Sequence, residues 1–519
     1  MSDETVHFER TGGNGVSSGR ATDARGAGPP APRRAWGDRA FLTALCVTAL
    51  PVAVQSLLSS SRSVIDVLLV SRLGDCEVAA VGYGSRVVFV VMLATLGMAD
   101  GGAVITAQLW GARSPERVRR ATAVTTTVAV GISLVAAGVC YLCAHPLAAL
   151  ATDDPRVVEL GAQYIRSVIW MVVPYAVLCS FAGSLRCVGD ARSAMRFTAV
   201  GLGLHLVFAW ALVLGNWGMP ALGVRGAGFA TTLSTYLECL LLGVYLYRTR
   251  HVTAFSPADV RAGVRDGLVR RIRAVGVPVS LSSTSWALGI LVYNILVGHA
   301  GTKELAVLSM ISPMESAAIA VFIGVSSASG VMLGNSMGES GAPPRRPGGS
   351  ADQAENSGPA ESSGPDRTWL LARTLLFWAA ATTAVVCLGL LSAVLWIGSI
   401  YSDADPATLD VARDTVLVLG VVFAFRAMNI TMMNGMLRAG GDTTFVLCAD
   451  LVSQWGVAIP LTWLTALVLG LPFPVIFLAV NAEEIVKFLV SGRRLLRRRW
   501  IRNLVADPAA DTPHPLEVP

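Results

Sequence analysis

Long apolar runs dominate the pattern of hydrophobic and polar positions along this chain. About twelve runs of roughly 20–30 residues alternate with shorter polar connections, and each run is long enough to cross a hydrocarbon core about 30 Å thick. Because lipid offers the backbone no hydrogen-bond partners, we expect every run to be helical. The predicted spans are 41–70, 77–109, 120–145, 158–184, 193–214, 222–247, 272–298, 303–336, 369–399, 409–436, 443–469 and 472–492.

The two halves of the chain resemble each other at fixed distances. Three pairs share residue type and context 227 positions apart: Pro51 with Pro278, Gly74 with Gly301, and Gly111 with Gly338. The motifs LRCVGD and LRAGGD lie 252 positions apart, which indicates an insertion in the second half. The repeat predicts an all-α integral membrane protein with twelve transmembrane helices. Its two six-helix lobes would be related by a pseudo-two-fold axis along the membrane normal.

Polar stretches between and beyond the repeats predict the domain boundaries. The insertion at 341–367 contains no apolar residue larger than alanine or proline. It cannot bury enough surface to order itself, so we predict a disordered cytoplasmic loop. The other predicted divisions are a disordered cytoplasmic tail at 1–40, an N-terminal lobe at 41–250, a cytoplasmic linker at 251–270, a C-terminal lobe at 271–499 and a cytoplasmic tail at 500–519.

Charge supports a membrane protein and predicts its orientation. Only 15% of the residues are charged and 53% are apolar, whereas soluble domains carry about 25% charged residues. Arginines crowd alternate connections, most densely at 248–273 and 493–502. Basic connections stay in the cytoplasm, so we expect a multi-pass protein of the cell inner (plasma) membrane with both termini cytoplasmic. The same distribution argues against nucleic-acid binding despite a net charge of +6.

The motif content argues against several function classes. The sequence has no GxxxxGK[ST] phosphate loop, so transport energy would have to come from an ion gradient rather than from ATP. No HExxH motif is present and no GxSxG motif lies in the predicted spans, which argues against an integral-membrane enzyme. We expect no metal and no organic cofactor. We predict a monomer in the lipid bilayer whose partner is a small organic substrate.

One carboxylate stands inside the first predicted span. The stretch Pro51–Asp66 (PVAVQSLLSSSRSVID) holds a proline, an arginine and an aspartate within an apolar run. An intramembrane carboxylate is a functional-site hypothesis by default, since charge is costly in hydrocarbon. Pro51 removes a backbone hydrogen bond and is the candidate hinge. In the alternative interpretation, Arg62 simply neutralises Asp66 four residues later. The repeat position of Asp66 holds Tyr293, so this acid belongs to the first lobe alone.

Motifs in both halves resemble those of the multidrug and toxic compound extrusion (MATE) family. The first half contains ALPVAVQS, DVLLVSRLGDCEVAAVG, AQLWGA, LRCVGDARSAM and MPALGVRGAGFATTLS, and the second contains VGVPVSL, LRAGGDTTF and VAIPLTW. The resemblance covers residues 41–500. It implies two six-helix lobes around a central cleft and export of organic, often cationic, compounds against inward sodium or proton flow.

The resemblance also implies an ion-coupling site. In the family, an aspartate at the place of Asp66 binds the coupling ion, usually beside Asn and Asp of helix five, whose places hold His205 and Ala209 here. Sodium prefers several oxygen ligands, whereas histidine titrates near neutral pH. We therefore favour H⁺ over Na⁺ as the coupling ion, with His205 as an accessory. A structural role for this histidine is the alternative.

Further residues are candidates for the cleft lining. Acids can attract a cationic substrate, and aromatic or methionine side chains can contact it by cation–π or dispersion interactions. The alternative for each acid is a structural ion pair, and for each apolar residue it is packing. Glu483 and Lys487, spaced i,i+4, are expected to be a structural pair. The candidates are Arg62, Asp100, Trp286, Tyr293, Asn294, Met314 and Glu315.

These observations predict a secondary active exporter that is coupled to a cation, with H⁺ favoured over Na⁺, and that works by rocking-bundle alternating access. The alternative is a flippase for a lipid-linked oligosaccharide or another amphipathic precursor. That function would need a large basic cavity, with Arg62, Arg86 and Arg426 together in the cleft.

Overall fold

The computed structural model describes residues 39–150, 152, 154–340, 364–402 and 405–505. Within these ranges the chain forms helices and no strand. Residues 1–38 of the predicted N-terminal tail, 341–363 of the predicted loop and 506–519 of the predicted C-terminal tail lie outside the described residues.

Six long helical segments build the first half. Their spans follow the apolar runs, because a helix satisfies its own backbone hydrogen bonds in lipid. The elements are α1 (Arg39–Val70), α2 (Asp75–Gly111), α3 (Pro115–Leu142), the short α4 (Ala144–Ala149), α5 (Pro155–Val168) continued by η2 (Ile169–Met171) into α6 (Val172–Cys187), α7 (Ala191–Leu214), η3 (Asn216–Gly218) and α8 (Val224–Arg248).

The second half follows α9 (Pro257–Arg265), a short helix in the connection between the halves. Three of its segments are π-helical turns, which often mark functional regions of helices. The elements are α10 (Leu268–Ala300), α11 (Thr302–Ser340), α12 (Gly364–Ile400), α13 (Pro406–Asn429) continued by the π-turn η5 (Ile430–Leu437), α14 (Thr443–Ser453), the π-turn η6 (Gln454–Ala458), α15 (Ile459–Trp463), the π-turn η7 (Leu464–Val468), α16 (Phe473–Val480) and α17 (Ala482–Leu496).

The predicted all-helical fold is confirmed. Eleven helices of the described chain are long and apolar enough to cross a membrane, and their ends differ from the predicted ones by a few residues. The twelfth predicted span, 472–492, is divided between α16 and α17 at Asn481. Asn481 leaves helical geometry, and its side-chain amide donates to the carbonyl of Phe477 at 2.9 Å. Charged residues in the first turns of α17 further lower the apolarity of this span.

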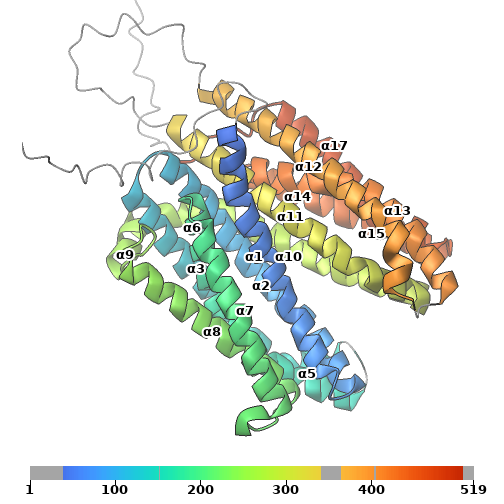
Figure 1. Ribbon diagram of the computed structural model, residues 1–519. Helices are drawn as coiled ribbons and strands as arrows, with labels where there is room; N and C mark the ends of the chain where they lie inside the picture. The colour runs from blue at the N-terminus through green and yellow to red at the C-terminus, as the bar shows by residue number, and fades with distance from the viewer. Residues whose placement is uncertain (1–38, 151, 153, 341–363, 403–404, 506–519) are drawn as a thin grey trace, which may run out of the picture.

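The helices assemble into two bundles that reflect the sequence repeat. Helix α1 packs against α11, and α10, the repeat partner of α1, packs against α2, the repeat partner of α11. The bundles converge where α1 begins and splay apart toward α5 in one and α13 in the other (Figure 1).

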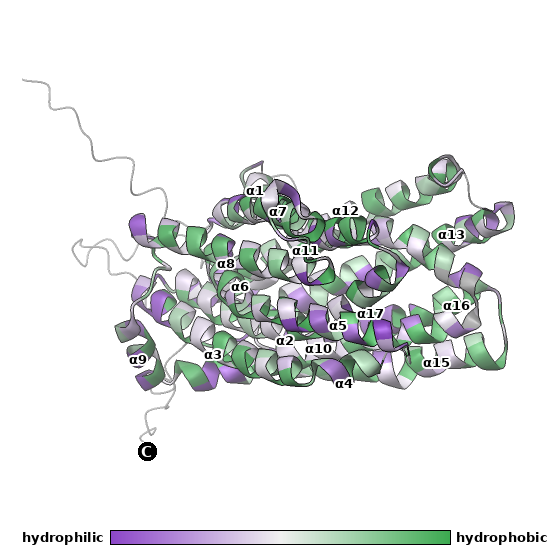
Figure 2. Cartoon of the chain, turned by 90° about the horizontal axis from the view of Figure 1, so that it is seen from below, coloured by the Kyte–Doolittle hydropathy of each residue, from purple (hydrophilic) through white to green (hydrophobic). Residues whose placement is uncertain are grey.

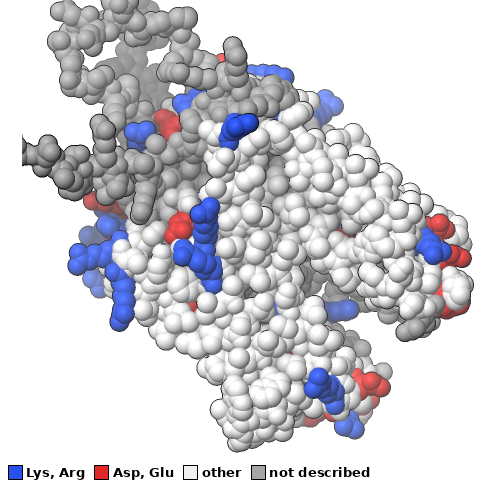
Figure 3. Space-filling model, viewed as in Figure 1, with Lys and Arg blue, Asp and Glu red and all other residues white. Residues whose placement is uncertain are grey.

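The outside of the molecule suits a lipid environment. Hydrophobic residues cover much of the helix surface in Figure 2, and large apolar side chains such as Leu395, 86% exposed, and Val135, 70% exposed, point outward. On the face seen in Figure 3, charged residues gather toward the helix ends and leave a largely uncharged band between them. Exposed apolar surface on this scale indicates contact with a membrane.

Two repeat-related glycines bring α2 and α11 into close contact. A Cβ atom on Gly111 would lie 2.0 Å from the carbonyl oxygen of Asn335, and one on Gly338 would lie 2.0 Å from the carbonyl oxygen of Gln108. A larger residue does not fit at either position without moving a backbone. Small residues of this kind allow membrane helices to approach closely.

Residues Trp500–Val505, which we call the C-terminal strap, follow α17 and pack at this helix junction. Trp500 is fully buried in a cluster that includes Phe41 and Met337. The amide of Gln108 in α2 donates to the carbonyls of Ala439 at 2.9 Å and Arg502 at 3.2 Å, and its oxygen accepts from the Leu504 N–H at 2.7 Å. The strap therefore contacts helices of both lobes.

Candidate functional site

The buried carboxylate of the first lobe lies between three helices. Asp66 in α1 is 6% exposed, and His205 in α7 is fully buried. Nε2 of His205 is 3.3 Å from Oδ1 of Asp66. The hydroxyl of Thr231 in α8 donates to Oδ2 of Asp66 at 3.3 Å. The structure thus brings together the two residues that the sequence suggested for ion coupling, and adds Thr231 to them.

This group is not fully hydrogen-bonded among the described residues. Although the Asp66–His205 contact is within ion-pair distance, it lacks hydrogen-bond geometry, and both His205 ring nitrogens and Oδ1 of Asp66 have no hydrogen-bond partner. Buried polar atoms left in this state are costly. Ala209, one turn further along α7, is also fully buried and supplies no polar atom beyond its backbone. Asp66 and His205 therefore keep polar atoms that are free to form one more hydrogen bond or to accept a proton.

Arg62 does not neutralise Asp66. Its guanidinium pairs with Glu238 of α8 instead, and the side chain of Glu238 is 4% exposed. Gly201 of α7 makes room for this pair, because a Cβ there would lie 2.1 Å from the Glu238 carboxylate. The alternative interpretation of Asp66 as the partner of Arg62 is therefore not what the structure shows.

Pro51 is buried inside α1, which continues through it as one helix. Because proline has no N–H, the carbonyl of Val47 one turn earlier lacks its usual helical hydrogen bond. This leaves a weakened point in a helix that also contacts α11 of the other lobe.

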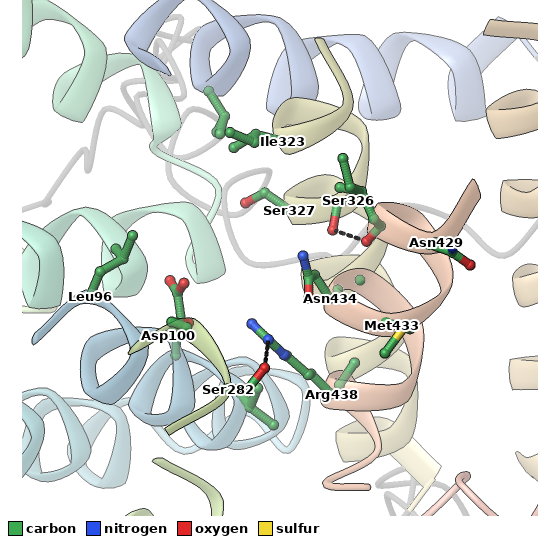
Figure 4. A pocket seen from close by; sticks show the side chains of 18 of the residues that line it. Leu96, Asp100, Ser282, Ile323, Ser326, Ser327, Asn429, Met433, Asn434 and Arg438 are labelled. Atoms are coloured by element: carbon green, nitrogen blue, oxygen red, sulfur yellow. Dashed lines mark hydrogen bonds between the residues drawn. The ribbon is translucent and has the colours of Figure 1, made fainter. Parts of the chain in front are cut away.

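A cavity of about 370 Å³ lies between the two lobes. This size is typical of sites for small molecules. Apolar residues such as Leu96, Trp286, Ile323 and Met433 form part of its wall. Figure 4 shows Asp100, Ser282 and Arg438 converging on one side of it. The charged residues of the lining are Asp100, Arg186, Arg426, Arg438, Asp450, Glu484 and Lys487.

Most of these charges are paired. Nη2 of Arg186 lies 3.3 Å from Oδ1 of Asp100, whose side chain is 39% exposed. Lys487 contacts Asp450 at 3.3 Å and Glu483 at 3.5 Å, which confirms the pair predicted from the i,i+4 spacing.

Arg426 contacts two acids, Glu315 and Glu484, the second at 3.5 Å. The side-chain amide of Asn429 also donates to the Glu484 carboxylate at 2.8 Å. Each of these carboxylates is thereby held by a fixed donor, which is how charge is tolerated inside a membrane protein.

The candidate cleft residues divide into two groups. Asp100 and Trp286 line the cavity, whereas Arg62 and the other four lie outside its lining. Tyr293 is buried with its hydroxyl 3.4 Å from Glu483, and the Asn294 amide donates to its own helix. Met314 packs against an apolar cluster of the second lobe, and Glu315 contacts Arg426 from outside the lining.

The sequence interpretation did not single out Arg186 and Arg438 as cavity residues. Both belong to the LRxxGD motifs and stand 252 positions apart, so they are repeat partners. Their shared place in the repeat was a signal that both halves direct an arginine toward the same axis. Because both motifs end at predicted cytoplasmic connections, their arginines were not recognised as residues of the cavity.

Comparison with known proteins supports a transporter. The family model MatE matches residues 51–211. A probable multidrug resistance protein NorM of Bradyrhizobium diazoefficiens is 27% identical over 466 residues, covering 88% of this chain and 93% of the relative. A second probable NorM, of Rhodopseudomonas palustris, is 26% identical and covers 85% of this chain and 88% of the relative.

Solved structures share the fold. The eukaryotic MATE transporter AtDTX14 superposes with a TM-score of 0.75 at 16% identity, covering 89% of this chain and 97% of that one. A MOP superfamily transporter from Pyrococcus furiosus superposes with a TM-score of 0.73 at 18% identity, covering 88% and 96%. These likenesses confirm the predicted fold of twelve helices in two lobes.

The helical bundles, the apolar exterior and the cavity between the lobes define a multi-span membrane transporter fold. The matching family model, the relatives and the solved structures show that this chain is similar to transporters of the MATE family.

Proposed function

We propose that this protein is a proton-coupled exporter of small organic compounds, located in the inner membrane with both chain ends in the cytoplasm. The names of its relatives, multidrug resistance proteins, support efflux. The single observation that carries proton coupling is the contact between Asp66 and His205, two buried titratable groups 3.3 Å apart.

Protonation would change how α1 and α7 attract each other. An added proton either neutralises Asp66 or charges His205, and in both cases the balance of charge in a buried pocket changes. Helix α1 carries Pro51 and packs against α11 of the other lobe. A change at Asp66 would therefore reach the interface between the lobes. If proton and substrate favour different conformations, the two are exchanged across the membrane.

The donor set favours a proton over sodium. In the part of the chain that the structure describes, the side chains in contact at this site are the Asp66 carboxylate, the Thr231 hydroxyl and the His205 imidazole. Hard cations prefer several oxygen ligands. With the orientation that the charge pattern of the connections predicts, the converging end of the lobes would face the cytoplasm. The cavity in this conformation would thus be accessible from outside.

The flippase alternative is less well supported. It required Arg62, Arg86 and Arg426 together in the cleft, but only Arg426 lines the cavity and Arg62 pairs with Glu238.

Transport in reconstituted vesicles under separately imposed proton and sodium gradients tests the proposal. We expect a proton gradient alone to drive efflux of a cationic dye such as ethidium, and Asp66→Asn to abolish it. His205→Asn should alter the pH dependence of efflux, because it removes the imidazole that contacts Asp66. Asp75→Asn, an exposed acid at the start of α2, is the matched control. Normal proton-driven efflux by Asp66→Asn would refute the coupling role.

A further inference from the structure

The two repeats place an arginine at the same point of the central cavity, but among the described residues only one of the two has a carboxylate within ion-pair distance. Arg186 and Arg438 both line the cavity. Arg186 contacts Asp100 at 3.3 Å. The residue 227 positions after Asp100 is Ser327, which also lines the cavity and carries no charge. The symmetry of the fold is thus broken at this pair.

Arg438 has few partners in the part of the chain that the structure describes. Its Nη2 donates to the hydroxyl of Ser282 at 3.2 Å, and its buried Nε has no hydrogen-bond partner. Asp450 and Asp100 are near enough to act on its charge, but no described carboxylate lies within ion-pair distance of it. The Ser282 hydroxyl donates in turn to Asp450, but the other oxygen of Asp450 already contacts Lys487 at 3.3 Å.

A guanidinium with unused N–H donors and no carboxylate at ion-pair distance is suited to bind an anion. Arginine carries five N–H donors in a planar fork that matches the two oxygens of a carboxylate, and charge-assisted bidentate pairs are the strongest hydrogen bonds that proteins form. Figure 4 shows Arg438 directed into the cavity beside Ser282. Apolar residues of the same lining, among them Trp286 and Ile323, would contact the uncharged body of a ligand.

We propose that Arg438 is the receptor for a carboxylate group on the transported compound, so that this protein accepts organic acids and zwitterions. The cavity of about 370 Å³ suits a small molecule rather than a lipid with long acyl chains. This inference deepens the proposed function and rests on it for transport, but binding can be measured without any gradient.

A matched pair of fluorescent probes, one with a free carboxylate and one with its methyl ester, tests the proposal on the purified full-length protein. Arg438→Gln should weaken binding of the carboxylate about ten- to a hundredfold, the scale of a charge-assisted hydrogen bond. Binding of the ester should change less than about twofold, and Arg438→Lys should fall between. Arg413→Gln, an exposed arginine paired with Asp410, is the control.

A second variant tests the proposal in a way that does not depend on whether Arg438→Gln folds correctly. Ser327→Asp places an acid at the position that corresponds to Asp100 in the first repeat. This acid should compete with the probe's carboxylate for Arg438, which is unchanged in the variant, and so reduce carboxylate binding. Equal weakening of both probes by Arg438→Gln, or unchanged carboxylate binding in both variants, would overturn the proposal. Wild-type protein that exports ethidium but binds neither probe would overturn it too, while leaving the exporter in place. Selective carboxylate binding without proton-driven transport of either the carboxylate probe or ethidium would support Arg438 and refute the exporter.

Discussion

Arg62 and Glu238 form a largely buried ion pair between α1 and α8, although Asp66 lies only one turn further along α1. This choice of partner has a functional consequence. Because the arginine is held by Glu238, the titratable group facing Asp66 from α7 is His205, and the hydroxyl facing it from α8 is that of Thr231.

Removing Glu238 should therefore destabilise the first lobe. Glu238→Gln leaves the Arg62 cation buried without its carboxylate, which costs about 3–5 kcal/mol. Thermal unfolding in detergent should show a clearly lower midpoint. Glu77→Gln removes an ion pair whose arginine, Arg156, is largely exposed, and should cost less than about 1 kcal/mol. Replacing Arg62 and Glu238 together by Met and Leu should recover most of the stability. An unchanged midpoint for Glu238→Gln would contradict the pairing.

The close contact of α2 and α11 should be essential to the conformation described here. Gly338→Ala places a methyl group against the Gln108 carbonyl, a backbone atom that cannot rotate away. We expect spin labels at Arg113 and Ser340 to report longer distances in this variant. Gly82→Ala, at a glycine with open space around its Cβ position, should leave the distances unchanged. Identical distance distributions for both variants would show that the contact does not hold the lobes together.

Trp500 should anchor the C-terminal strap. Trp500→Ala removes a fully buried aromatic side chain from the cluster with Phe41 and Met337, a loss of about 3–5 kcal/mol. Thermal unfolding measures it, and Trp217→Ala, at a tryptophan that is 75% exposed, should have little effect. Equal stability of the two variants would mean that the strap is peripheral.

Helix α9 should lose its attachment in acid. Burial favours the protonated carboxyl, but hydrogen bonds from Ser256 and Arg119 outweigh it and lower the pKa of Asp259. The stabilisation is therefore present above the ordinary aspartate pKa of about 3.9 and disappears as pH falls through the lower folded value. Hydrogen exchange of α9 should be faster in Asp259→Asn than in the wild type near neutral pH. The two should converge in strong acid, and a difference that persists there would contradict this account.

The sequence was a good guide to the helices and a partial guide to the site. Apolar runs predicted the spans because lipid requires helical segments of a given length. The twelfth span was less accurate, since Asn481 interrupts it and the acids of α17 are buried within the protein. His205 could be placed near Asp66 through a family resemblance. The partner of Arg62 could not, because it depends on the rotation of α8 against α1, which no local pattern encodes.

The position of the C-terminal strap in the chain determines when it can pack during protein synthesis. Trp500–Val505 follow every helix of both lobes along the chain, yet they hydrogen-bond to Gln108 in α2. The ribosome has therefore delivered all the membrane spans before these residues can reach their place, and domains generally form as they emerge. The lobes would insert and meet first, and Trp500–Val505 would pack against the junction between them only after all the spans have been made.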